Sequence, residues 1–150
     1  MLFRSAAIGA RQALAAAKAI DHALDRANAE IAAELGQPVV IGMGLHAGPV
    51  VLGEIGHPSG MTLDVIGETV NAAARMESLT KDEGCQLVVS AGVLELAGAI
   101  LAGLPGKTVA VRGIDKPIEV TLVASARGLP DIPPVAAGPT VDTISAVNSR

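Results

Sequence analysis

The first quarter of the chain carries one long helical pattern, which strongly limits what this sequence can fold into. Residues 5–35 are rich in alanine and contain no proline. Their large apolar residues recur at spacings of four, seven and four: Ile20, Leu24, Ile31 and Leu35. Such spacings place apolar side chains along one side of a helix. Gly36 and Pro38 end the pattern, because glycine suits a left-handed cap and proline cannot continue a helix. The sequence therefore predicts a long helix within residues 1–36.

The rest of the chain alternates short strand patterns with shorter helical ones. Strands are expected at residues 39–45, 50–55, 62–66, 86–90, 108–112 and 118–124, and helices at residues 68–79 and 92–101. Tight turns such as Gly48-Pro49 separate neighbouring strands, instead of the regular helical crossovers of a parallel doubly wound sheet. The expected fold class is α+β, a mainly antiparallel sheet packed with helices. One domain over residues 1–127 is expected, followed by a disordered tail at 128–150 that lacks hydrophobic periodicity.

Composition excludes several classes of function. The formal net charge is −4 with no basic run, and the only aromatic residue is Phe3, so nucleic acid is not an expected partner. Cys85 is the only cysteine, which rules out an internal disulfide, and no secretory signal is recognisable. A cytoplasmic location is therefore expected. No apolar stretch reaches the ~20 residues that a membrane span needs. His46, beside glycines, is expected to be a packed or backbone-bonded histidine.

The segment LDVIGETVNAAARM, residues 63–76, brings three kinds of polar group into one strand-to-helix unit. Asp64 supplies a carboxylate, Asn71 an amide and Arg75 a guanidinium. If the helix has begun by residue 70, Asn71 and Arg75 are one turn apart on the same face, with about 6 Å between their Cβ atoms. One ligand can then contact both side chains. Together these groups are suited to a base, a sugar and a phosphate.

This segment resembles the signature of class III nucleotidyl cyclases, the adenylate and guanylate cyclases that make cyclic nucleotides from nucleoside triphosphates. Three further segments resemble the family in the same order. These are IGMGLHAGPVVLGEIG at 41–56, like the glycine-rich hairpin before the active-site helix; GCQLVVS at 84–90, like the strand after it; and VRGIDKPIEV at 111–120, like the closing hairpin. The resemblance covers roughly residues 5–127. It implies the ferredoxin-like cyclase core without its N-terminal strands.

The resemblance also implies a role for each polar group. In cyclisation the ribose 3′ oxygen attacks the α-phosphorus and pyrophosphate leaves, so catalysis depends on placement and electrostatics. Arg75 would meet the charge on the α-phosphate, where a bidentate guanidinium is better suited than an amine. Asn71 would orient the ribose. Asp64, with Ile66 and Gly67 beside it, occupies the family's base-reading position, and a carboxylate there favours the exocyclic amine of adenine and hence ATP.

The parts of the site that handle outer phosphates and metal are less complete. The family often carries a basic residue in the closing hairpin, and Arg112 and Lys116 are both candidates that the sequence does not separate. The resemblance implies Mg or Mn ions held by two aspartates that precede the long helix, and this chain begins too late to contain them. Asp21 and Asp25 lie on a helix that is remote from the nucleotide in the family. Alone, the chain is therefore expected to be nearly inactive.

The leading hypothesis is the C-terminal part of an adenylate cyclase catalytic domain that converts ATP to cyclic AMP and pyrophosphate in intracellular signalling. Its expected partner is a second copy or another cyclase domain that supplies the metal aspartates. An alternative is a non-catalytic module for dimerisation or nucleotide sensing. A dinucleotide-binding fold is also suggested, because Gly42, Gly44 and Ala47 match G-x-G-x-x-G/A after a strand. That fingerprint must open a helix, however, and Gly48-Pro49 followed by two valines cannot continue one.

Overall fold

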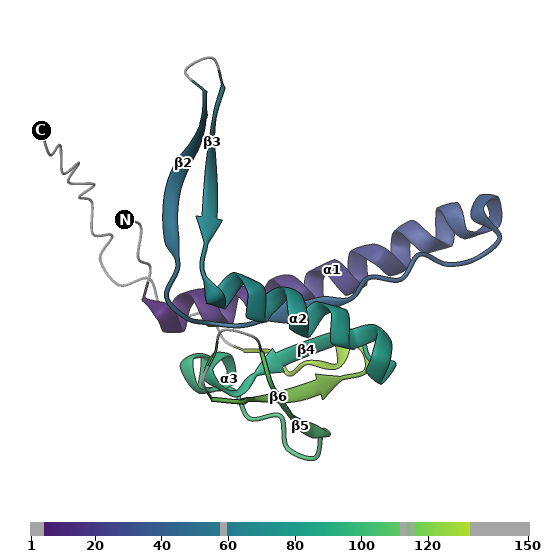
Figure 1. Ribbon diagram of the computed structural model, residues 1–150. Coiled ribbons are helices and arrows are strands. Elements are labelled where there is room, and N and C mark those ends of the chain that lie inside the picture. The colour runs from purple at the N-terminus through teal and green to yellow at the C-terminus, as the bar shows by residue number, and fades with distance from the viewer. Residues whose placement is uncertain (1–4, 58–59, 112–113, 115, 133–150) are drawn as a thin grey trace, which may run out of the picture.

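A computed structural model describes residues 5–57, 60–111, 114 and 116–132 (Figure 1). The elements, in chain order, are α1 (Ala6–Leu35), β1 (Met43–Leu45), β2 (Val51–His57), β3 (Gly60–Ile66), α2 (Glu68–Glu83), β4 (Leu87–Ser90), α3 (Ala91–Ala97), β5 (Gly106–Val109), β6 (Ile118–Val123) and the 3-10 turn η1 (Ala126–Gly128). A four-stranded sheet has the order β1-β4-β6-β5, and β2 and β3 form a separate two-stranded sheet. Only β1 and β4 pair in parallel within these sheets, so the expected α+β class with a mainly antiparallel sheet is confirmed.

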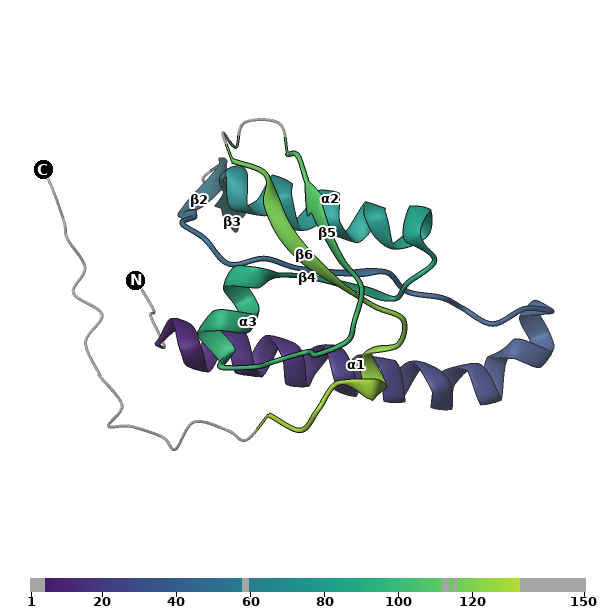
Figure 2. The same cartoon turned by 90° about the horizontal axis from the view of Figure 1, so that it is seen from below.

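Helices cover both faces of the four-stranded sheet, which is seen between α2 and α1 in Figure 2. Side chains of β4 contribute to two hydrophobic cores, one on each face of the sheet, because Leu87 and Val89 point to one face and Val88 to the other. The first core joins Leu87 and Val89 to α1, α3 and η1. The second joins Val88 to α2, β5 and β6. β4 is therefore buried along its whole length.

The long helix α1 has nearly the bounds that the sequence predicts, but it buries a different stripe. The residues that face the sheet are Ala10, Leu14, Ala17 and Asp21. Ile20 is exposed because it lies outside this buried stripe, and Leu35 is exposed where the second half of α1 runs beyond the sheet (Figure 2). Small alanines let the first half pack closely on α3 and η1. Helical periodicity predicted the element correctly, whereas the sheet's extent decides which side chains are covered.

The segment between α1 and β1 is extended but is not the strand expected from residue 39 onward. Asn28 on α1 holds it, donating from Nδ2 to the Val39 carbonyl oxygen at 2.9 Å and accepting from the Val39 N–H at 2.8 Å. The Asn28 side chain thus makes the two backbone hydrogen bonds at Val39 that a neighbouring strand would otherwise make. The regular pairing with β4 begins only at Met43.

The hairpin near the centre of the chain lies later in the sequence than the Gly48-Pro49 turn predicts. Gly48 and Pro49 connect the two sheets, and the paired strands are β2 and β3, with Val51 opposite Ile66 and His57 opposite Gly60. The β2–β3 hairpin projects away from the body (Figure 1). Glycine and proline predicted a change of direction correctly. The strands on either side of that change belong to different sheets, which depends on non-local pairing.

The chain after β6 continues to pack against α1 beyond residue 127, where the sequence predicts the end of the domain. Ala126 and Leu129 are buried in the core beside α1. Lys18 donates from Nζ to the Leu129 carbonyl oxygen at 2.9 Å and forms an ion pair with Asp131 at 2.6 Å. We call residues 124–132 the C-terminal strap. The rest of the expected tail, residues 133–150, lies outside the described residues.

Candidate functional site

The candidate site is built where β3 passes into α2. Gly67 stands between them with φ 153° and ψ 165°, a backbone conformation that favours glycine. Its carbonyl oxygen then accepts hydrogen bonds from the N–H groups of Val70 and Asn71 at 3.0 and 3.4 Å, which starts the helix. Gly84 ends α2 in the left-handed conformation, with its N–H bonded to the Thr80 carbonyl oxygen. One unbroken helix thus carries both Asn71 and Arg75.

Asn71 and Arg75 are both exposed on α2. The buried side of the helix is formed instead by Ala72, Met76 and Leu79, which pack on the sheet. Neither the side chain of Asn71 nor that of Arg75 is hydrogen-bonded or ion-paired to another residue that the structure describes. An amide and a guanidinium therefore stand one turn apart with their polar groups available to a ligand.

Asp64 lies on β3 opposite Gly53 of β2, and its side chain is exposed. One carboxylate oxygen, Oδ1, accepts a hydrogen bond from the Val65 N–H at 2.8 Å. Ile66 is the last residue of β3 and is 52% exposed. The carboxylate and the apolar side chain that the sequence analysis associated with the base are thus both on the surface, on the strand that leads directly into α2.

Of the two candidate cations in the closing hairpin, one can be located. Lys116 is exposed and precedes β6, whereas Arg112 lies outside the described residues. The start of β6 lies at the same end of the molecule as the first turn of α2 in both views (Figures 1 and 2). Val111 and Ile118 also belong to the apolar cluster that α2 covers. The closing hairpin is therefore a neighbour of the helix that carries Asn71 and Arg75.

The glycines before the hairpin allow α2 to lie directly on β1. A Cβ added to Gly44 would be 2.4 Å from the Ala73 carbonyl oxygen and 2.6 Å from the Glu77 nitrogen, both in the backbone of α2. A Cβ added to Gly42 would be 2.2 Å from Thr80 Oγ1. A larger residue at Gly44 therefore requires α2 to move, and one at Gly42 requires the Thr80 side chain to shift. The G-x-G pattern thus serves strand-to-helix packing and opens no helix, which is inconsistent with the dinucleotide-binding reading.

No group of three or more His, Cys, Asp or Glu side chains within the described ranges could hold a metal ion. Asp21 is 1% exposed, and its carboxylate accepts hydrogen bonds from Gln86 Nε2 at 2.8 Å, Ser125 Oγ at 2.7 Å and the Arg127 backbone N–H at 2.9 Å. Burial by itself raises the pKa of this carboxyl, but the hydrogen bonds, first that of the Arg127 side chain, outweigh burial and hold the pKa well below its usual range. Asp21 is therefore fully used within the fold. The described residues do not fit the metal ions that the resemblance implies.

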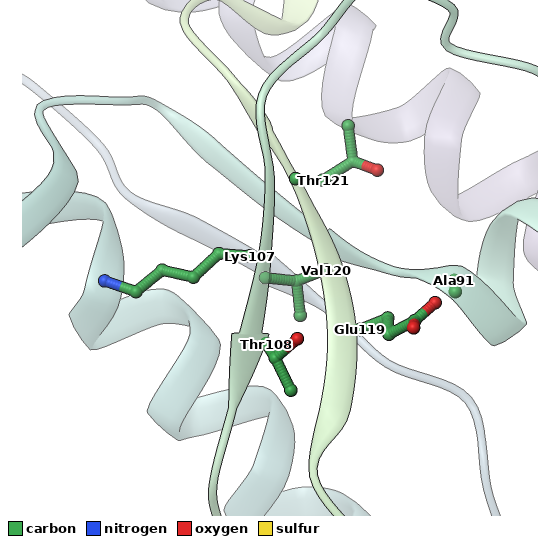
Figure 3. Close-up of a pocket in the computed structure, with 7 residues that line it drawn as sticks. Ala91, Lys107, Thr108, Glu119, Val120 and Thr121 are labelled. Atoms are coloured by element: carbon green, nitrogen blue, oxygen red, sulfur yellow. The ribbon is translucent and has the colours of Figure 1, made fainter.

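A shallow groove of about 410 Å³ lies elsewhere on the sheet (Figure 3). Thr108, Glu119 and Thr121 of β5 and β6 line it together with Ala91. These residues alternate with Val120, which packs under α2, so the groove is on the sheet face away from α2. Lys107 also lines the groove, and its ammonium forms an ion pair with Glu83 at the end of α2. The groove is distinct from the candidate site.

His46 makes a contact that the sequence did not predict. Its Nδ1 lies 3.0 Å from Oγ of Ser90, a fully buried residue at the end of β4. Burial lowers the pKa of His46. The histidine is thus packed, as expected, but its partner is a side chain brought from a neighbouring strand. Local sequence carries no signal for such a pair.

Comparison with known proteins places this chain in a family. Residues 6–117 match the family described as the adenylate and guanylate cyclase catalytic domain. An adenylate cyclase of Anabaena cylindrica is 36% identical over 115 residues, covering 72% of this chain. The crystal structure of the guanylyl cyclase Cya2 is similar with a TM-score of 0.67 and 33% identity, covering 77% of this chain. The protein belongs to the class III nucleotidyl cyclase family.

The chain spans only part of these relatives. The matched region is 23% of the Anabaena protein and 58% of the Cya2 chain. Adenylate cyclase 1 of Rhizobium meliloti is 27% identical over 77 residues, which is 12% of its length. One relative is named for adenylate and another for guanylate chemistry at similar identity.

No described helix is long and apolar enough to cross a membrane.

Proposed function

We propose that this chain is the part of an adenylate cyclase catalytic domain that holds the ribose and the α-phosphate of ATP during conversion to cyclic AMP and pyrophosphate. The observation that carries the proposal is the pair of exposed polar side chains on α2, Asn71 and Arg75, which the fold itself does not use. They follow directly on β3, where the exposed Asp64 supplies a carboxylate for the exocyclic amine of adenine. In a cyclase family member, this order of groups matches the order of base, sugar and phosphate.

Each residue contributes by position and charge. Asn71 donates and accepts hydrogen bonds with the ribose hydroxyls, which directs the 3′ oxygen at the α-phosphorus. Arg75 donates two hydrogen bonds to the α-phosphate oxygens, where negative charge increases in the transition state. Lys116 or Arg112 attracts the leaving pyrophosphate. Because pyrophosphate carries several negative charges, a cation at that end assists its departure.

In cyclases, Mg or Mn ions activate the attacking oxygen and neutralise the leaving group. Because the described residues do not fit such ions, we propose that a second polypeptide supplies the metal ligands, either another copy of a cyclase domain or a different one. The isolated chain is then nearly inactive. An assembly is active when it combines the partner's metal ligands with this chain's Asn71 and Arg75, acting in the cytoplasm.

Complementation tests the proposal. The full chain is mixed with a cyclase domain that keeps its metal-binding aspartates but has its own equivalents of Asn71 and Arg75 replaced by alanine. Cyclic AMP formed from ATP is measured, with formation of the complex followed by analytical ultracentrifugation. The expected result is little product from either protein alone and clear product from the mixture. Arg75→Ala in this chain should abolish the rescue, whereas Arg26→Ala, at an exposed position on α1, should not.

A confirmed complex that makes no cyclic nucleotide would contradict the catalytic proposal. It would favour the alternative, a non-catalytic module for dimerisation or nucleotide sensing. That module predicts ATP binding that Asp64→Ala weakens, without any product. Product from GTP in preference to ATP would keep the catalytic role but overturn the assignment of adenine to Asp64.

A further inference from the structure

At the base of the β2–β3 hairpin, the segment that enters it lies against the segment that leaves it. Thr69, in the first turn of α2, donates from Oγ1 to the Pro49 carbonyl oxygen at 2.6 Å. A Cβ added to Gly48 would be 2.6 Å from the same Thr69 oxygen, so a larger residue at position 48 would displace it. Two parts of the chain that are twenty residues apart are thereby joined by one side-chain hydroxyl.

Few other described contacts fix the direction of this hairpin. At its base Val51 is 68% exposed and Leu52 is 54% exposed, so no covering layer holds these side chains against the body. Gly67 joins the hairpin to α2 with an unusual backbone conformation, and the backbone of Pro49 and Val50 lies close to it. Glycine allows many backbone conformations, so Gly67 alone does not fix the angle between the hairpin and α2. The Thr69–Pro49 hydrogen bond supplies the restraint that Gly67 lacks.

We infer that Thr69 is a positioning residue, whose hydroxyl sets Asp64 on the hairpin relative to Asn71 and Arg75 on α2 and so selects the base of the nucleotide. Asp64 precedes Gly67 by three residues and Thr69 precedes Asn71 by two. A change in the angle between hairpin and helix moves the carboxylate that meets the base without moving the pair that meets the ribose and phosphate. The consequence for base selection rests on the proposed function. The cross-link itself is a property of this chain alone.

The cross-link is tested without any catalysis. Hydrogen exchange is measured for the amides of Val70 and Asn71, which donate to the Gly67 carbonyl oxygen. Thr69→Val keeps the shape of the side chain but removes the donor, and exchange at both amides should accelerate about tenfold as the junction opens more often. Thr69→Ser keeps the hydroxyl and should exchange nearly as the natural chain does. Unchanged exchange in Thr69→Val would overturn the inference.

A matched control on the same helix is Ser78→Ala. Ser78 Oγ donates to the Ala74 carbonyl oxygen at 3.0 Å, so this variant also removes a hydroxyl-to-carbonyl bond, but one that does not reach the hairpin. The amides of Val70 and Asn71 should be unaffected by it. Acceleration equal to that of Thr69→Val would mean that any loss on α2 loosens the junction, and would overturn a specific role for Thr69.

Base selection is tested in the complemented assembly by the ratio of kcat/KM for ATP to that for GTP. Thr69→Val should lower this ratio about tenfold, because a displaced carboxylate discriminates less well between the two bases, and Thr69→Ser should restore it. A merely structural role lowers the active fraction for both nucleotides and leaves the ratio unchanged, which would overturn the positioning role. If the natural chain yields no product at all, the proposed function fails, and the exchange experiment still decides whether Thr69 holds the hairpin.

Discussion

The two faces of the central sheet use polar side chains in opposite ways. On the α1 face, Asp21 is buried and satisfied by Gln86, Ser125 and Arg127, which fastens the C-terminal strap to the helix. On the α2 face, Asn71 and Arg75 are exposed, and neither has a partner among the described residues. The Asp21 network on the first face contributes to the fold, and the side chains of Asn71 and Arg75 on the second are available to a ligand. Substitutions on the two faces should therefore separate stability from activity.

The largest expected effect is on activity and comes from the α2 face. Arg75→Ala should lower cyclic AMP formation in the complemented assembly by about 100- to 1000-fold, the usual loss when a donor to transition-state charge is removed. The free energy of unfolding should change by less than about 0.5 kcal/mol, because the side chain is exposed. Both are measured on the same preparation, by product formation and by urea unfolding. If Arg75→Ala lowered stability and activity together, the proposed separation of the two faces would be contradicted.

Removal of the buried carboxylate on the α1 face should have the opposite signature. Asp21→Ala is expected to destabilise the chain by about 2–4 kcal/mol, because it removes charge-assisted hydrogen bonds and leaves the partly buried donors of Gln86 and Ser125 without their partner. Urea unfolding measures the change. Asp25→Ala is the matched control, since this second carboxylate partner of Arg127 is 46% exposed, and should cost less than about 1 kcal/mol. Equal effects of the two variants would contradict the distinction drawn between buried and exposed pairing.

The contact between β1 and α2 predicts a somewhat smaller loss. Gly44→Ala should destabilise by about 1–3 kcal/mol, because the new methyl group meets the backbone of α2 and the helix must shift. Gly9→Ala is the control, since a Cβ at this exposed position on α1 meets nothing within 4 Å and should stabilise by about 0.5–1 kcal/mol. Urea midpoints measure both. If Gly44→Ala is neutral, the glycines before the hairpin do not serve this packing.

The pH dependence of stability should also reveal the contribution of Asp21 on the α1 face. The pKa of this carboxyl is lower in the folded chain than its ordinary value of about 3.9. As the pH falls, Asp21 therefore takes up a proton in the unfolded chain before it does so in the folded chain. The stabilisation of the fold by the Asp21 carboxylate is fully present above the pKa of the unfolded chain and is lost as the pH falls below it. Urea midpoints between about pH 6 and pH 3 should fall less steeply in Asp21→Asn than in the natural chain. Parallel curves would show that Asp21 does not contribute to acid sensitivity.

Local rules predicted much of the candidate site. Asn71 and Arg75 share a face because helix geometry depends only on their separation, and a helix begins close to where glycine and the apolar pattern indicate. The same rules gave α1 and the strands β4 and β6 within a few residues. They did not show that the strands on either side of Gly48-Pro49 belong to different sheets, because which strands pair depends on residues far away in the chain. The roles of Asn71, Arg75 and Asp64 remain predictions.

Other features carried no usable signal in the sequence. The network around Asp21 joins α1 to residues as many as 106 positions later, and nothing near Asp21 indicates that it is buried. Leu129 stands between Gly128 and Pro130 without periodicity, yet it completes the core beside α1. Thr69 looks like an ordinary first-turn residue until Pro49 is found beside it. Each case depends on a contact between distant segments.

By itself, the sequence determined the order of helices and strands, the family to which the chain is similar, and the spacing that sets an amide one turn before a guanidinium. These follow from periodicities of a few residues and from motifs read along the chain. The tertiary structure decided which polar groups the fold consumes and which it leaves exposed. Burial and hydrogen bonding depend on surfaces that meet only after folding. For this reason Asp21 is buried and stabilises the fold, whereas Arg75 is exposed and available to a ligand.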